Sequence, residues 1–143
     1  MDVKIREAIK KRVEEEPFAR KFGLRLTALE EGYSKVEMRV DGEMENIFRM
    51  AHGGALFALI DEAFETASNS HGTVAVALNM NVSYIAPAKA GDLLTAEARE
   101  YSLTRRTANY DIKVHDDKGK LIAACNALVY RKGTPLPFLP DQD

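Results

Sequence analysis

The feature that most constrains this chain is strict alternation between residues 74 and 84. Apolar side chains occupy every second position of this run, namely Val74, Val76, Leu78, Met80, Val82 and Tyr84. Successive side chains of a β-strand point to opposite faces of the sheet, so the pattern predicts a strand with one buried face. A lone strand cannot bury that face. The rest of the chain must therefore supply partner strands and a covering layer.

Shorter alternating runs supply the partner strands. They lie at residues 24–26, 36–40, 94–98, 108–114 and 121–129. Gly32 separates the first two runs and predicts a hairpin, while residues 116–119 (Asp-Asp-Lys-Gly) predict a turn between the last two. Strands joined by connections this short must be antiparallel. The sequence therefore predicts an antiparallel sheet of about six strands.

One stretch departs from the period of two. Residues 53–67 are dominated by alanine, leucine and phenylalanine, and the run ends near Asn69 and Gly72. A helix whose first turns are apolar on all sides is buried rather than lying on a surface. We therefore predict an α+β fold in which the sheet wraps around one long central helix. Such a sheet keeps unpaired edges, which favours self-association.

Both ends of the chain are predicted to be peripheral. Apolar residues recur at helical spacing among charged ones in residues 1–17, which are expected to form an amphipathic helix on the outside, ended by Pro17 and carrying no functional site. Residues 18–132 form the main domain in this interpretation. Residues 133–143, with three prolines, are expected to be a loose tail.

Composition narrows the class of protein. An apolar content of 45% suffices for one packed domain, and a net charge of −2 with interspersed signs argues against a nucleic-acid binder. No window approaches the roughly 18 apolar residues of a membrane-spanning helix, and the N-terminus lacks an apolar signal segment. The single cysteine, Cys125, forms no internal disulfide, as is usual in a reducing compartment. We expect a cytoplasmic protein with no nucleic-acid or membrane partner.

The candidate chemistry lies around the start of the central helix. Backbone N–H groups in a first helical turn lack intrahelical partners, and Gly53 and Gly54 would let a substrate oxygen approach them. That arrangement suits a carbonyl oxygen that becomes negative during reaction. Asp61 follows two helical turns later, and desolvation there would make its carboxylate a general base or a nucleophile. The ordinary alternatives, a tight turn and a salt-bridged helix residue, stay open.

Two further polar residues precede the helix. Asn46 offers a donor and an acceptor that could orient a water molecule, or it serves as an ordinary turn residue. His52 could bind the loop or the substrate. On the helix itself, Glu65 shares the face of Asp61 and is a weaker candidate, whereas Glu62 is expected to be solvated.

The full spacing Asn46-x5-His52-Gly53-Gly54-x6-Asp61 is more specific than its parts. With the segments 69–72, 81–92 and 110–112, it resembles the hotdog-fold acyl-CoA thioesterases of the phenylacetate-pathway (PaaI-type) group, over roughly residues 18–131. The resemblance implies a hotdog fold. It also implies a homodimer or homotetramer that hydrolyses an acyl-CoA thioester at a site between two subunits.

The resemblance also implies roles for the motif residues. Asp61 corresponds to the catalytic carboxylate, and the Gly54 amide would polarise the thioester carbonyl beside the substrate-binding Gly53. Asn46 and His52 would hold the water, the substrate and the loop. No cofactor is implied, since coenzyme A is part of the substrate, and the three histidines and one cysteine form no metal-binding pattern.

The chain departs from the family at one position. Some members carry a hydroxyl residue, which helps to position the water, where this chain has Ala77. Asn79 lies two positions further and would share the strand face, so it is a possible substitute. Water positioning is therefore less well defined by the sequence than the role of Asp61.

Coenzyme A carries phosphates, so a binder needs cations near the mouth of its site. Candidate groups are Lys89 and the segment Arg105, Arg106 and Thr107, all next to turns. Ordinary surface cations are the alternative. The acyl group, expected to be a small aryl or medium-chain group, would lie along the helix near Phe57 or Phe64.

Two other functions remain to be weighed. A non-catalytic acyl-CoA-binding module on the same fold is favoured by Ala77 and disfavoured by an intact Asp61. A hydratase would require a paired aspartate and histidine in a different arrangement, which the sequence does not contain. Fold resemblance does not separate these functions, so the site residues must.

Overall fold

The computed structural model describes residues 1–140 and contains one six-stranded antiparallel sheet and three α-helices. The elements in chain order are α1 (Val3–Glu15), α2 (Pro17–Phe22), β1 (Arg25–Glu30), β2 (Tyr33–Arg39), a 3-10 turn (Gly42–Met44), α3 (Gly53–Asn69), β3 (Thr73–Tyr84), β4 (Leu93–Leu103), β5 (Thr107–Asp116) and β6 (Leu121–Pro135). The predicted sheet, the hairpin at Gly32 and the central helix are confirmed.

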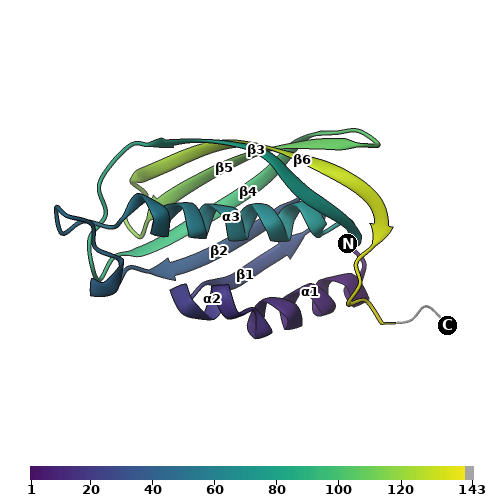
Figure 1. Ribbon diagram of the computed structural model, residues 1–143, viewed down its shortest axis with the longest axis horizontal. Helices are drawn as coiled ribbons and strands as arrows, with labels where there is room; N and C mark the ends of the chain where they lie inside the picture. The colour runs from purple at the N-terminus through teal and green to yellow at the C-terminus, as the bar shows by residue number, and fades with distance from the viewer. Residues whose placement is uncertain (141–143) are drawn as a thin grey trace.

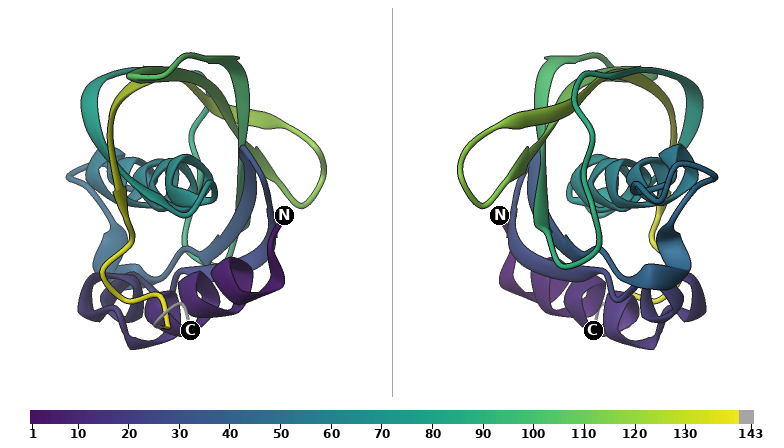
Figure 2. Two further views of the ribbon diagram at one scale, coloured as in Figure 1. Left: turned by 90° about the vertical axis from the view of Figure 1, so that its right-hand side faces the viewer. Right: turned by 90° about the vertical axis from the view of Figure 1, so that its left-hand side faces the viewer.

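The strand order β1-β2-β4-β5-β6-β3 explains the place of the helix. Because α3 connects β2 to β3, it carries the chain from one side of the sheet to the opposite edge. Figures 1 and 2 show the sheet curling around α3, with β1 and β3 as its two edges. This is the hotdog fold that the resemblance implied.

Small side chains on the inner face of the sheet let α3 sit close to it. Five buried alanines come from β4, β5 and β6, namely Ala96, Ala98, Ala108, Ala123 and Ala127. Larger side chains fill the remaining space, and the ring of Phe64 on α3 packs edge-on against that of Tyr110, with centroids 5.6 Å apart. A core so closely packed fixes the rotation of α3, and therefore the direction in which each of its side chains points.

The exposed side of α3 is a single stripe. After the first turn, the only helix positions that are not buried are Phe57, Asp61, Glu65 and Asn69, each four residues from the next. Residues at this spacing lie on one face of a helix. The sheet and the N-terminal helices cover every other face, so Asp61 lies on the one side of α3 that a partner could reach.

A polar network holds the last turns of α3 to the sheet. Ser34 Oγ on β2 donates a 2.6 Å hydrogen bond to the carbonyl of Ala63, and Ser70 Oγ accepts one of 2.7 Å from Gly32 N–H. Beyond the helix, His71 Nε2 lies 2.8 Å from Glu100 Oε2. These bonds join α3 to the β1–β2 hairpin and to β4, and so fix its position along the sheet.

The N-terminal prediction was incomplete. Pro17 does not end the helical region but occupies the first turn of a second helix, α2, where its missing N–H costs nothing. Figure 2 shows α1 and α2 lying across the open side of the curled sheet. The segment from 1 to 17 is therefore a cover over α3 rather than an external addition.

The prediction of a loose tail was wrong for its first part. Strand β6 continues to Pro135, and Leu136 is only 5% exposed, with its N–H donating to the carbonyl of Gly72 at 3.1 Å. Pro135, the last residue of β6, still pairs with Thr73 at the start of β3, and Pro137 and Pro140 come after the strand has ended. Residues 141–143 lie outside the described part of the chain.

A β-bulge alters the face on which Asn79 lies. The register moves from Ala77 opposite Val129 to Asn79 opposite Leu128, so two residues of β3 advance against one of β6. Directly paired residues share a face, and Val129 is buried in the core while its neighbour Leu128 points the other way. Ala77 and Asn79 therefore lie on opposite faces, contrary to the expectation from unbroken alternation.

No helix within residues 1–140 combines the length and the apolar content that crossing a membrane requires.

Candidate active site

The first turn of α3 begins at an imidazole cap. His52 has an extended backbone (φ −63°, ψ 138°), and its Nδ1 accepts a 2.8 Å hydrogen bond from Gly54 N–H. This is the N-cap geometry that satisfies one free donor of the helix. The amide predicted to polarise the substrate carbonyl is thus already bonded to the imidazole.

Gly53 lies close against a tyrosine side chain. Tyr84, at the end of β3, donates from its hydroxyl to the Gly53 carbonyl at 3.1 Å. A Cβ at residue 53 would lie 3.3 Å from the Tyr84 ring, tighter than most real contacts. The two glycines therefore leave room for two neighbouring side chains. Gly53 leaves room for Tyr84, and Gly54 leaves room for the His52 ring, since a Cβ at residue 54 would lie only 3.1 Å from His52 Nδ1.

Asn46 organises the loop that leads into α3. Its Oδ1 accepts from Phe48 N–H at 2.8 Å and from Met50 N–H at 3.1 Å, and the turn between them places Arg49 at φ +59°. The side-chain oxygen is therefore engaged in a turn, the ordinary role weighed for this residue. At the tip of the loop, Ile47 and Phe48 are 91% and 70% exposed, so the loop presents apolar side chains to its surroundings.

Asp61 is half-buried and opens onto a cavity of about 450 Å³. The other lining residues are Glu16, Phe18, Ala58, Glu62, Phe64, Glu65, Ser68, Asn69, Ala75, Val76 and Ala77. Burial, and secondarily the charge of Glu16, raises the pKa of Asp61 above its usual value. A carboxylate in this setting is a stronger base than one in water, as a proton acceptor or nucleophile requires.

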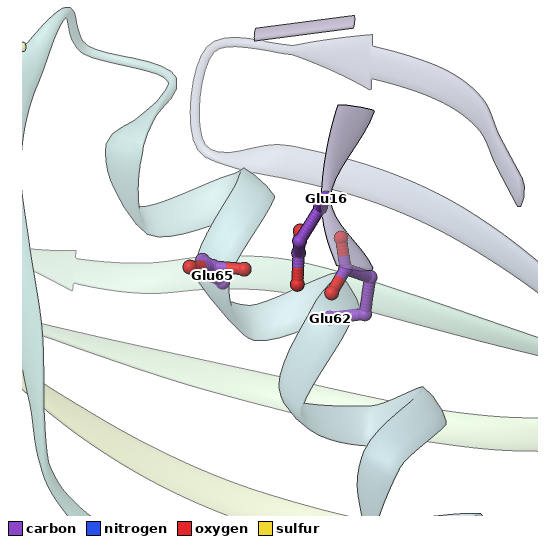
Figure 3. Close-up of side chains that lie close together, drawn as sticks. All are labelled: Glu16, Glu62 and Glu65. Atoms are coloured by element: carbon purple, nitrogen blue, oxygen red, sulfur yellow. The ribbon is translucent and has the colours of Figure 1, made fainter. Parts of the chain in front are cut away.

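Glu62 contradicts its prediction. It was expected to be solvated, yet it is only 3% exposed, because the junction of α1 and α2 covers its face of α3. Burial, with the charges of Glu65 and Glu16, raises the pKa of Glu62 to about 9. Figure 3 shows the carboxylates of Glu16, Glu62 and Glu65 turned toward one another. Sequence reasoning missed this group because Glu16 reaches α3 only in the folded chain.

The strand residues separate into two groups. Ala77 lines the cavity of Asp61, while the bulge turns Asn79 away from it. The expected substitution of Asn79 for the missing hydroxyl group is therefore not supported within one chain. No hydroxyl side chain of β3 stands where Ala77 faces Asp61.

The predicted phosphate-binding residues lie far apart in one chain. Lys89 precedes the 11-residue strand β4, and Arg105 and Arg106 follow it. A strand of this length spans about 35 Å. Arg106 donates to the hydroxyl of Tyr130 at 3.0 Å, and Thr107 holds the β4–β5 turn through Thr104. A single nucleotide cannot contact both groups within one subunit.

Gly54 and Asp61 are also separated. Seven residues of α-helix correspond to about 10 Å along the axis. A general base must lie within about 3 Å of the water that it activates, and that water within a similar distance of the carbonyl carbon. The carboxylate of one chain therefore lies too far along α3 to act on a carbonyl held at the Gly54 of the same chain.

Comparison with known proteins identifies the family. The family model described as Thioesterase superfamily matches residues 48–123, just over half of the chain, a range that includes His52, Gly54 and Asp61. The chain belongs to the thioesterase superfamily. Its sequence is 35% identical to the acyl-coenzyme A thioesterase PaaI of Escherichia coli K12, over 84% of this chain and 86% of that one. It is 31% identical to human acyl-coenzyme A thioesterase 13, over 86% and 91% respectively.

Solved structures agree with this membership. The Escherichia coli PaaI structure superimposes with a TM-score of 0.88 at 32% identity, covering 92% of this chain and 96% of that one. A Streptococcus mutans protein solved with bound acetyl CoA gives a TM-score of 0.76 at 26% identity, covering 79% and 91%.

Within the thioesterase fold, this chain brings together some of the predicted residues and not others. His52, Gly53 and Gly54 meet at the start of α3, and Asp61 shares the exposed stripe of that helix with Phe57. Phe64 is buried but lines the Asp61 cavity, in keeping with its expected place along the acyl group.

Proposed function

We propose that this protein hydrolyses an acyl-CoA thioester to the free acid and coenzyme A, with Asp61 as the catalytic carboxylate. The observation that carries the proposal is the setting of Asp61. It is a half-buried carboxylate with a raised pKa, on the uncovered stripe of α3, in a cavity lined both by apolar side chains such as Phe18 and Phe64 and by the carboxyl groups of Glu16, Glu62 and Glu65. A purely structural aspartate would be expected to have a cationic partner, and no ion pair within residues 1–140 includes Asp61.

The ionised carboxylate can start the reaction in two ways. As a general base, it takes a proton from water, and the hydroxide adds to the thioester carbon. As a nucleophile, it adds to that carbon itself, and water then cleaves the resulting anhydride. In both routes the carbonyl oxygen becomes negative, the carbon–sulfur bond breaks, and the thiolate of coenzyme A leaves and takes up a proton.

The Gly54 amide is the proposed donor to that negative oxygen. It lies in the first turn of the 17-residue helix α3, where the positive end of the helix dipole adds to the hydrogen bond. We infer that the carbonyl oxygen takes the place now held by His52 Nδ1. Asn46, which shapes the loop before His52, then keeps the vacated imidazole close to the substrate.

A complete site requires a second copy of the chain, because about 10 Å separates Gly54 from Asp61 along one helix. Strand β3 is a sheet edge that exposes Leu78 (58%), with Ile85 (55%) exposed just beyond its end, and edges of this kind pair with other strands. Two β3 strands related by a two-fold axis would run antiparallel and would set their α3 helices side by side in opposite directions. The first turn of one helix then faces the middle of the other.

The acyl group proposed is a small aryl or medium-chain group. Phe57, Phe64 and the alanines of β3 offer apolar surface beside Asp61. A cavity of about 450 Å³ lies within the usual range for small-molecule sites, toward its lower end. The nucleotide would lie outside it. In a dimer, Lys89 of one subunit and Arg105 and Arg106 of the other could flank one coenzyme A molecule that neither group could hold alone.

The experiment that tests the proposal replaces Asp61 with Asn, which keeps the size and polarity of the side chain but accepts no proton. We expect kcat for a medium-chain acyl-CoA to fall by at least about 100-fold, with circular dichroism and elution volume unchanged. Asp117→Asn, in the exposed turn before β6, is the matched control and should retain full activity. A folded Asp61→Asn protein that hydrolyses acyl-CoA at the rate of the control would refute the proposal.

A second part of the same experiment tests whether each site is formed by two chains. Gly54→Val should block the first turn of α3, so each variant alone should be inactive. Co-refolded mixtures of Asp61→Asn and Gly54→Val chains would contain dimers with one intact site, formed by the unaltered Asp61 and the unaltered Gly54. We expect activity to return in the mixture. A mixture as inactive as its parents, with mixed dimers shown by mass, would place both groups in one chain.

A further inference from the structure

Three carboxylates meet without a cation where the N-terminal helices cross α3. Oxygen atoms from Glu16, Glu62 and Glu65 all lie within 4.8 Å of one another. Glu62 and Glu65 come from successive turns of α3, and Glu16 comes from the junction of α1 and α2. Figure 3 shows the three side chains converging from these elements.

The charges are not neutralised by the chain itself. Within residues 1–140, no ion pair includes any of the three carboxylates. The nearby polar side chains are engaged elsewhere, since Ser68 Oγ and Asn69 Nδ2 both donate to the carbonyl of Glu65, at 3.2 Å and 2.9 Å. Carboxyl groups at this separation repel one another when they are ionised and must retain protons when they are not, and both cost free energy at neutral pH, so the arrangement as it stands opposes the packing of α1 and α2 onto α3.

Glu62 shows most directly that a partner is missing. Its side chain is 97% buried, and its Oε1 atom has no hydrogen-bond partner in the described chain. A buried carboxylate oxygen without a partner is costly. Glu16 points the same way: it stands at the N-cap of α2 yet makes no capping hydrogen bond, and its carboxylate is directed to α3 instead.

We propose that Glu16, Glu62 and Glu65 form a binding site for a hard divalent cation, with Ca²⁺ as the best fit. Carboxylate oxygens are the ligands that such cations prefer. Oxygens on opposite sides of Ca²⁺ are about 4.6–5.2 Å apart, so three oxygens within 4.8 Å can share one ion. Mg²⁺ requires every pair to lie within about 4.2 Å and demands a stricter octahedron.

The bound ion would join the N-terminal cover to the central helix. One of its ligands lies between α1 and α2, and two lie on α3, so binding connects segments that are far apart in the sequence. The remaining coordination positions would be filled by water from the adjoining cavities, since Glu16 and Glu65 line both hollows beside the cluster. The site adjoins the cavity of Asp61, which the same three glutamates line, but its test measures unfolding and ion binding and does not use activity.

The test measures thermal unfolding of the full-length protein after treatment with a chelator and dialysis. We expect CaCl₂ to raise Tm with saturation in the wild type, well beyond NaCl of equal ionic strength. Glu62→Gln and Glu65→Gln should weaken Ca²⁺ binding at least tenfold by calorimetry and lose most of the rise. Glu14→Gln removes the same charge two residues from Glu16, on an exposed side chain, and should behave as wild type.

The chelated proteins give a second readout of opposite sign. Without a cation, Glu62→Gln should melt at or above the wild-type Tm, because the amide is neutral without having to take up a proton; with Ca²⁺ it should melt below it. Glu65 is exposed, so its glutamine variant keeps the test valid if Glu62→Gln fails to fold. Absence of a Ca²⁺ effect in the wild type, or an equal effect in Glu65→Gln, overturns the proposal.

Discussion

Removing one hydroxyl group should measure how much a single buried hydrogen bond between β5 and β4 contributes to stability. Tyr110 on β5 is fully buried, and its hydroxyl donates a 2.6 Å hydrogen bond to Glu100 Oε2 on β4. Burial, then Glu100, raises the pKa of Tyr110, so the phenol stays a donor. The change Tyr110→Phe deletes this bond but keeps the ring, which packs against Phe64.

The expected cost follows from the charge of the acceptor. A hydrogen bond to a charged group contributes about 1.5–3 kcal/mol. Glu100 keeps His71 at 2.8 Å after the change, so its carboxylate is not left without a partner, and we expect about 1.5–2 kcal/mol. For a chain of 143 residues, the unfolding entropy converts that loss into a fall in Tm of about 5–7 °C.

Urea unfolding and thermal melts at one fixed protein concentration provide the assay. The matched control is Tyr130→Phe, because the hydroxyl of Tyr130 accepts only from the exposed guanidinium of Arg106, at 3.0 Å. We expect the control to lose less than about 0.5 kcal/mol. If the two variants lose equal stability, the buried bond from Tyr110 to Glu100 contributes no more than the exposed bond of Tyr130, which refutes the expected cost.

Two further predictions concern catalysis. The pKa of Asp61 is raised, and its carboxylate must be ionised to act. Activity should therefore be lost, as pH falls, at a pH above the usual aspartate range. The measurement is kcat/KM against pH in the presence of a chelator. Glu16, Glu62 and Glu65 line the cavity with Asp61. Glu16→Gln should lower the pH at which kcat/KM falls, because the charge of Glu16 contributes to the raised pKa of Asp61. An unchanged pH profile would contradict this role of Glu16. Separately, Lys89→Ala and the Arg105→Ala/Arg106→Ala pair should each raise KM for acyl-CoA several-fold and leave hydrolysis of short thioesters without a nucleotide unchanged. Equal losses on both substrates would argue against phosphate contacts.

The fold was predictable because its strongest signals are local. Alternation recurs in six separate runs, and the apolar run beginning at Gly53 departs from it, so the sheet and α3 could be deduced without coordinates even though a bulge divides the alternation from Val74 to Tyr84 between two faces. The short connections then left only antiparallel pairing. The family motif around Asp61 likewise lies within 16 consecutive residues, from Asn46 to Asp61, and can be read without knowing the fold.

The errors arose where one extra residue or one distant contact decides the outcome. The bulge at Ala77–Asn79 needs a single unpaired residue, which no period of two can reveal, and it reversed the face of Asn79. The sequence predicts that the N-terminal helix ends at Pro17, although proline is also common in the first turn of a helix, which is where it lies in α2. The prolines of residues 133–143 predict a loose tail. Leu136 is nevertheless buried, because its N–H donates to the carbonyl of Gly72, a contact that exists only in the folded chain.

The misassignment of Glu62 is the most informative, because it links the cover to the site. A helical wheel places Glu62 away from Asp61 and the apolar face, where solvent is the natural expectation for a carboxylate. That expectation holds only if nothing covers the face. In the fold, α1 and α2 close the open side of the curled sheet, bury Glu62, and contribute Glu16 and Phe18 to the cavity of Asp61. The segment expected to lie outside the site therefore helps to set the basicity of its central carboxylate, and changes in the first 18 residues should alter catalysis as well as stability.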